Sequence, residues 1–167
     1  MTAHQLFAAI SPALAAQILE TVHTADRDLY RVALHTVAQA RKVRPVFLER
    51  QPREDRHRTM TAALGRPDMN MVAGNVLSGW LVKNQSALLG DFLDGLKIAH
   101  EKGVVENLPP SVDDAALQAT VDQLLAKHPP EIVALYLHAF FGMNEARWPN
   151  LEALLMNDSR VALGGGK

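Results

Sequence analysis

The apolar residues in the second half of the chain recur at an offset of 44 residues, and this repetition constrains the fold more than any other feature. Identical or chemically similar residues occupy seven positions: Leu81, Lys83, Leu88, Leu89, Phe92, Leu93 and Glu101 in the first copy, and Leu125, Lys127, Ile132, Val133, Tyr136, Leu137 and Glu145 in the second. In each copy, apolar residues at helical spacing end at a lysine and resume after a polar or proline-containing turn. The pattern predicts two helical hairpins.

Helix pairs with a period of about 40 to 47 residues are typical of HEAT and armadillo arrays, which need three or more copies. Only two copies are visible in this sequence. We therefore expect a compact helical bundle with an internal duplication and a HEAT-like period, not a long solenoid.

Helical spacing of apolar residues continues upstream of the duplication, and no alternating run is long enough to predict a sheet. The sequence predicts an all-α bundle of about seven or eight helices. We expect one domain, residues 1–163, and a flexible tail, residues 164–167. The expected helices run from Pro12 past Val22, from about Leu29 to Arg44, from Arg53 to Leu64, from Asp68 to Lys83, from Leu88 to Leu96, from Leu117 to Leu125, from Ile132 to Phe141 and from Pro149 to Met156.

Three serines stand where helices are expected to begin. A serine hydroxyl accepts a hydrogen bond from the free backbone N–H groups of the first helical turn. We therefore expect Ser11, Ser86 and Ser111 to cap the helices that follow them, the last as part of a Ser-x-x-Asp box that ends at Asp114.

Composition restricts the class of protein. With 167 residues, 48% of them apolar and 21% charged, the chain has the composition of a soluble globular domain. The absence of cysteine excludes disulfides, thiolate metal sites and cysteine nucleophiles, and it fits a reducing compartment. The first ten residues lack the pattern of a secretion signal, and no apolar stretch approaches the length of about 18 residues that a membrane span needs. We expect a cytoplasmic protein with no membrane partner.

Positive charge is concentrated in one short window. Residues 41–58 hold seven of the 17 basic residues and three acidic ones, a net charge of +4 in a chain whose total is −1. A positive stripe attracts phosphates or acidic partners, or neutralises acidic residues of its own fold. The candidate binding residues are Arg41, Lys42, Arg44, Arg50, Arg53, Arg56 and Arg58.

One pair of residues, Glu20 and His23, has the spacing of metal ligands on a helix. Helical carboxylate metal proteins use this Glu-x-x-His unit twice, on separate helices, whereas the chain has one copy. We interpret the two residues as a solvated pair and expect no metal and no cofactor.

A possible pocket is formed by His35, Tyr136 and His138. His138 lies in the most apolar run of the sequence, where burial of a charged imidazole is costly. A neutral, hydrogen-bonded core histidine is the first interpretation, and a ligand-binding or acid-base role is the alternative. Asp91 and Asp94 are close enough on a helix to form an acid-base couple, but the second copy does not repeat them, which favours a solvated face.

No catalytic motif accompanies these residues. The sequence has no Gly-x-Ser-x-Gly and no glycine-rich loop between a strand and a helix. We therefore predict a module without catalytic activity that binds another protein through a helical surface, because binding needs only shape and a few anchors. One alternative is a nucleic-acid-binding regulator that uses residues 41–58. The other is an enzyme or small-molecule binder with a pocket near His138.

Overall fold

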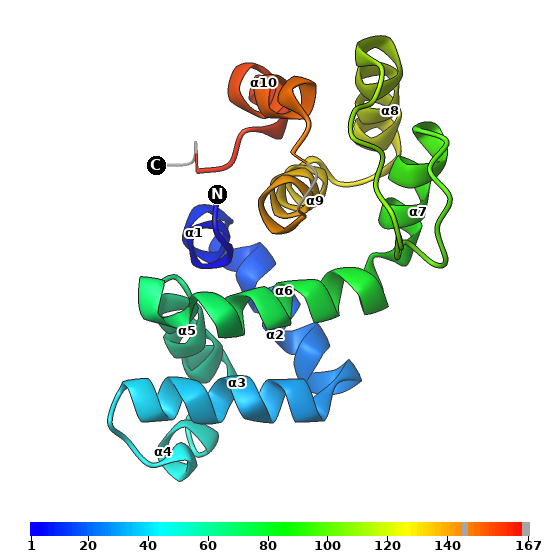
Figure 1. Ribbon diagram of the computed structural model, residues 1–167. Coiled ribbons are helices and arrows are strands. Elements are labelled where there is room, and N and C mark those ends of the chain that lie inside the picture. The colour runs from blue at the N-terminus through cyan, green and yellow to red at the C-terminus, as the bar shows by residue number, and fades with distance from the viewer. Residues whose placement is uncertain (145–146, 165–167) are drawn as a thin grey trace. The chain divides into compact units, whose positions relative to one another are not determined.

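The computed structural model describes residues 1–144 and 147–164, and these residues fold almost entirely into helices (Figure 1). They form ten α-helices and two short 3-10 helices, and the only β pairing among them is an isolated bridge between Glu101 and Val104. The predicted all-α class is confirmed. The helices outnumber the predicted seven or eight because two of them, of seven and five residues, are too short to show a helical period.

The chain divides into two compact units, which are described separately. The N-terminal unit comprises Thr2–Trp80, and the C-terminal unit begins at Leu81. The single domain predicted for residues 1–163 stays a prediction. In the predicted tail, Gly164 has a positive φ of 84°, and residues 165–167 lie outside the described residues.

The N-terminal unit is built around α5, which packs against α1, α2 and α3. Its helices are α1 (Ala3–Ala9), α2 (Pro12–Ala25), α3 (Arg27–Ala40), α4 (Pro45–Glu49), α5 (Arg53–Leu64), a 3-10 helix (Pro67–Met69) and the greater part of α6 (Asn70–Asn84). The core side chains come from faces with helical spacing, among them Ile18, Leu19, Val37, Met60 and Leu64.

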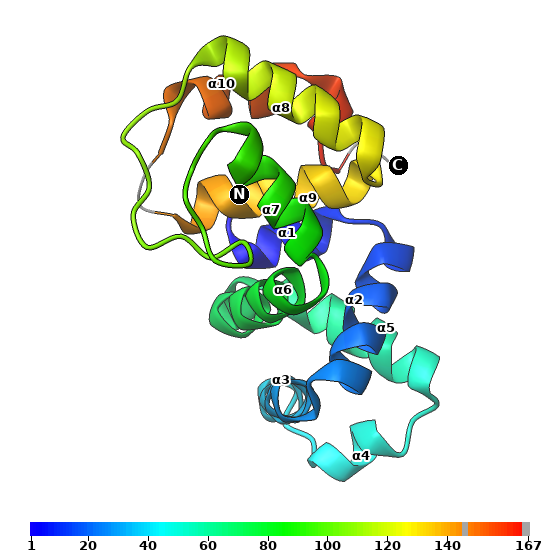
Figure 2. The same cartoon turned by 90° about the vertical axis from the view of Figure 1, so that its right-hand side faces the viewer.

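The C-terminal unit contains α7 (Ser86–Gly95), α8 (Asp114–Lys127), α9 (Pro130–Met143), α10 (Pro149–Asn157) and a 3-10 helix (Ser159–Val161). The long connection between α7 and α8 runs as a loop outside these helices (Figure 2). Within α9, eight residues are buried, as expected for a helix that is apolar on nearly all sides. The prediction that Ile132–Phe141 forms a buried helix is confirmed.

Aromatic side chains form the centre of the C-terminal unit. Phe92 contacts Tyr136 and Phe140 edge-on, with ring centroids 5.4 and 5.1 Å apart, and Phe140 contacts Trp148 at 5.3 Å. Phe92 and Tyr136, the aromatic pair of the predicted duplication, are therefore both buried in one core. The duplication itself stays a prediction, and its last position, Glu145, lies outside the described residues.

One of the three predicted serine caps is confirmed and two are wrong. Ser11 Oγ accepts from the Leu14 N–H at 3.2 Å. Ser86 is instead the first residue inside α7, and Gln85 occupies the N-cap position. The cap of α8 is Asp113, whose carboxylate accepts from the Ala116 N–H at 2.9 Å. Asp113 is two residues closer to the helix than Ser111, and Asn150 contacts the same helix start by donating to the Val112 carbonyl and to Asp114.

No helix in the described part of the chain is both long enough and apolar enough to cross a membrane.

Candidate interaction surface

A sharp turn joins α3 to α4 and projects a short segment from the N-terminal unit. Lys42 has a positive φ of 56°, and the N–H groups of Lys42 and Val43 return to the carbonyls of Gln39 and Ala38. This is the Schellman pattern that ends helices, with lysine where glycine is usual. Pro45 then starts α4 as its first residue. We call residues 41–50 the α3–α4 corner.

The α3–α4 corner exposes apolar side chains. Phe47 is 62% exposed, and Val43 and Val46 are each 38% exposed. Leu48 points the other way and is buried, so it anchors α4 to the unit. The five-residue helix α4 therefore buries Leu48 and leaves the ring of Phe47 exposed to solvent.

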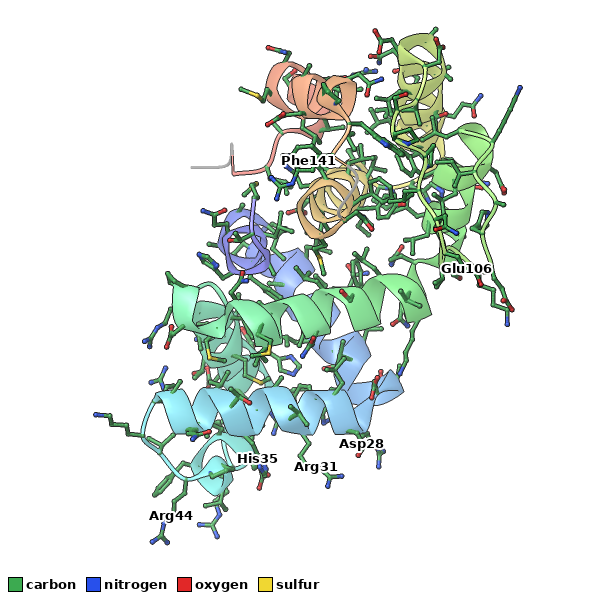
Figure 3. The ribbon with its side chains drawn as sticks, viewed as in Figure 1. Asp28, Arg31, His35, Arg44, Glu106 and Phe141 are labelled. Carbon is green, nitrogen blue, oxygen red and sulfur yellow. The ribbon has the colours of Figure 1, made fainter. Side chains whose placement is uncertain are left out.

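The basic window divides into two groups. Arg53 pairs with Glu20 at 2.7 Å, Arg58 pairs with Glu54 and Asp55 at 3.2 Å, and Arg56 donates to a tyrosine. The side chains of the other four cations form no ion pair or hydrogen bond within residues 1–144 and 147–164; these are Arg41, Lys42, Arg44 and Arg50, all in the corner. Figure 3 shows Arg44 pointing away from the helices. The segment that carries Phe47 therefore has four cations and one carboxylate, Glu49, a net charge of +3.

A buried polar relay lies beneath the corner. Arg56 Nε donates to the Tyr30 hydroxyl at 2.9 Å, and this hydroxyl lies 3.0 Å from His57 Nε2. On the other side of the ring, His57 Nδ1 is 3.9 Å from a carboxylate oxygen of Glu20. We call Glu20, Tyr30, Arg56 and His57 the Tyr30 relay. It links α2, α3 and α5, and His57 is only 4% exposed.

Burial lowers the pKa of His57, and burial together with Arg53 and Arg56 lowers the pKa of His23, both below the ordinary value of 6.5. A histidine whose pKa is lowered by folding binds its proton more readily in the unfolded chain. Its contribution to stability is complete above pH 6.5 and is lost as the pH falls below that value.

We therefore expect the free energy of unfolding to be flat above about pH 7 and to fall as the pH drops below about 6.5. Urea denaturation at pH 7.5 and 5.5 measures this, and His57→Gln should show a smaller difference between the two pH values than the wild type. A stability that rises on acidification would contradict the assigned direction.

The three residues of the predicted pocket, His35, Tyr136 and His138, do not all lie in the same unit. His35, in the N-terminal unit, is half exposed, and its Nε2 is 3.8 Å from Glu49 Oε1. In the C-terminal unit, burial raises the pKa of Tyr136 and lowers that of His138, whose Nε2 lies 3.1 Å from the Val161 carbonyl. His138 is thus a hydrogen-bonded, half-buried histidine. A common pocket of the three residues stays a prediction.

The two aspartates of α7 each contact a histidine. Asp91 accepts from Lys127 Nζ at 2.9 Å and lies 2.6 Å from His128 Nε2. Burial raises the pKa of Asp91, but these hydrogen bonds outweigh burial and lower the pKa overall. Asp94 is exposed and lies 2.9 Å from His100 Nε2, while His100 Nδ1 accepts from the Gly103 N–H. His100 thereby connects α7 to the turn that follows it.

Glu20 and His23, the predicted solvated pair, have different neighbours in the structure: Glu20 lies against Arg53 and His23 against Tyr30. Glu20 binds Arg53, and among the described residues no group of three or more histidine, aspartate or glutamate side chains is arranged to hold a metal. The His23 Nδ1 atom is buried without a hydrogen-bond partner in this part of the structure.

The described surface has several hollows large enough for small ligands. One, of about 560 Å³, lies between α1, α2 and α5; it is mainly apolar and reaches His57. Another, of about 840 Å³, lies beside the loop after α7 and is lined by charges of both signs, including Lys102 and Glu106; Figure 3 labels Glu106. Neither of these two brings together groups with a recognisable catalytic arrangement.

Comparison of the chain with protein-family models, curated proteins and solved structures gives no match. The chemistry of the surface is therefore the basis for a functional assignment.

Proposed function

We propose that the protein is a binding module without catalytic activity and that the α3–α4 corner is its contact surface for a protein partner. One observation carries the proposal: Phe47 is 62% exposed between two partly exposed valines and four cations without local partners. Aromatic and arginine side chains are the residues that most often dominate protein interfaces.

The corner is also held in place, which reduces the entropy lost on binding. Buried Leu48 fixes one face of α4, and Arg56 Nη1 donates to the Glu49 carbonyl at 3.1 Å at its end. Pro45 restricts the backbone at its start. Phe47 is thus presented by a fixed turn.

The charge of the corner selects the partner. A partner segment with acidic side chains around an apolar anchor is favoured by the four cations of the corner, Arg41, Lys42, Arg44 and Arg50. Complementary charge speeds the encounter of two proteins and disfavours basic partners.

The proposal includes a cytoplasmic location, supported by the absence of cysteine. It also includes the duplicated hairpins, supported by the shared burial of Phe92 and Tyr136.

Selection of peptides from a random display library on the purified protein tests the proposal. We expect enriched peptides to combine acidic residues with an aromatic or large aliphatic residue. Phe47→Ala should weaken the selected peptide by about tenfold or more, as for an interface hot spot. Met71→Ala is the matched control, because Met71 is 78% exposed on α6 of the same unit, and it should bind like the wild type.

Charge reversal separates a protein partner from a nucleic acid. Arg44→Glu should weaken peptide binding, whereas Arg31→Glu, an exposed change on α3 (Figure 3), should not. Labelled single-stranded and duplex DNA of 20 nucleotides form the second probe. Tight DNA binding that weakens steeply with salt, with no acidic peptide enriched, would replace the proposal with a nucleic-acid-binding role for residues 41–58.

A further inference from the structure

One side chain connects the α3–α4 corner to the Tyr30 relay. The guanidinium of Arg56 donates from Nε to the Tyr30 hydroxyl and from Nη1 to the carbonyl of Glu49, the last residue of α4. The position of Arg56 therefore depends on Tyr30, and the end of α4 depends on Arg56.

The donors and acceptors of the relay fix its proton arrangement. Arginine only donates, so the Tyr30 oxygen accepts from Arg56, and the hydroxyl hydrogen is free to donate to His57 Nε2. His57 is then neutral with its proton on Nδ1, which faces Glu20 Oε2 at 3.9 Å. In this state the Tyr30 hydroxyl both accepts from Arg56 and donates to His57, and the Glu20 carboxylate lies near the Nδ1 proton.

We propose that protonation of His57 breaks the Tyr30 relay and loosens α4, so that the α3–α4 corner is ordered at neutral pH and mobile in mild acid. The consequence for partner binding rests on the proposed function. The change in α4 does not.

The chemistry of the protonated state supports this. A charged His57 donates from Nε2, so the Tyr30 hydrogen loses its acceptor and the Tyr30 oxygen faces two cationic donors. His57 and Arg56 then repel each other beside the buried His57 ring, where water screens the charges less than at an open surface. Arg56 relieves the repulsion by moving away, which releases the Glu49 carbonyl.

The other groups around His57 do not remove this effect. From α2 it faces Glu20, which favours the proton but is already bound to Arg53 at 2.7 Å, and His23, which opposes it. From α3 it faces Tyr30, and α1 contributes only apolar buried residues. Burial, Arg53 and Arg56 keep the pKa of His57 below 6.5 despite Glu20.

Hydrogen exchange of the full chain without any partner tests the inference. We expect amides of residues 46–50 to exchange about tenfold faster or more at pH 5.5 than at pH 7.5, after correction for intrinsic rates, as for loss of a hydrogen bond to a charged group. His57→Gln, which is neutral at both pH values, should abolish the difference. His23→Gln should keep it. Residues 114–127 of α8 serve as the internal control.

A second variant covers the case in which His57→Gln fails to fold. Tyr30→Phe removes the relay's central atom, so the amides of residues 46–50 should exchange rapidly at both pH values. The inference is overturned if wild-type exchange of residues 46–50 does not change with pH, if His57→Gln keeps the change, or if Tyr30→Phe behaves like the wild type. Because no peptide takes part, this result and the peptide-binding result can fail independently.

Discussion

Replacing Phe92 with alanine will lower the free energy of unfolding of the C-terminal unit by about 3–5 kcal/mol. Phe92 is fully buried, and its ring meets Tyr136 and Phe140 edge-on. The substitution removes these aromatic contacts and leaves a cavity in a core that is closed on several sides, because α9 is buried on most of its surface. Urea denaturation followed by circular dichroism and by Trp148 fluorescence, in a Trp80→Phe background, measures the loss.

Phe47→Ala is the matched control for this experiment. It makes the same chemical change at a ring that is 62% exposed, so the free energy of unfolding should change by less than about 0.5 kcal/mol. If the two substitutions cost the same, Phe92 is not at the centre of a packed core and the fold is wrong in this region.

Replacing Gly95 with alanine will destabilise the C-terminal unit by about 1–3 kcal/mol, although alanine is the better helix former. A methyl group at this position would lie 2.6 Å from Thr120 Oγ1 and 2.7 Å from Thr120 Cγ2. Thr120 is buried and its hydroxyl donates to the Ala116 carbonyl at 2.7 Å, so it has no room to turn away. Helices α7 and α8 can approach this closely only because Gly95 lacks a side chain.

Gly90→Ala, in the same helix, should have the opposite sign. Its methyl group would meet only the His100 ring at 3.5 Å, an ordinary contact, so we expect a gain of about 0.5–1 kcal/mol from helix propensity. In a Thr120→Ala background, Gly95→Ala should lose most of its cost. Persistence of the full cost there would show that its origin is not the α7–α8 approach.

The elements that the sequence predicts best are those whose ends carry strong local signals. The helix expected at Arg53–Leu64 has those bounds in the structure, because Pro52 and Gly65 bracket it. The helix at Ala3–Ala9 was missed because seven residues show no clear period. A signal for it exists in Thr2 and Gln5, since the Thr2 N–H donates to Gln5 Oε1 at 2.8 Å, as in a capping box.

The contacts of the site were largely beyond sequence reasoning. Periodicity shows which face of a helix is buried, but not which residues of two helices meet, because that depends on how far one helix is displaced along the other. Tyr30 and His57 are 27 residues apart, and Asp91 and His128 are 37 apart. The local Glu54–Arg58 ion pair, in contrast, follows from spacing within one helix.

The exposure of Phe47 illustrates the same limit. The sequence shows a short apolar run, Val46 to Leu48, after a proline, and the run alone does not indicate which of its side chains is buried. Only the direction of a five-residue helix decides that Leu48 is buried and Phe47 is exposed. That direction follows from the turn at Lys42, whose positive φ is unusual for lysine.

The most direct test of the central claim is to map the bound peptide on the protein by NMR. Uniformly labelled protein is titrated at pH 7.5 with the acidic peptide selected on it, and backbone amide shifts are followed. We predict that the largest changes fall within residues 41–50 and that Phe47→Ala removes them. Changes concentrated elsewhere, with residues 41–50 unaffected at saturating peptide, would contradict the assignment of the α3–α4 corner as the contact surface.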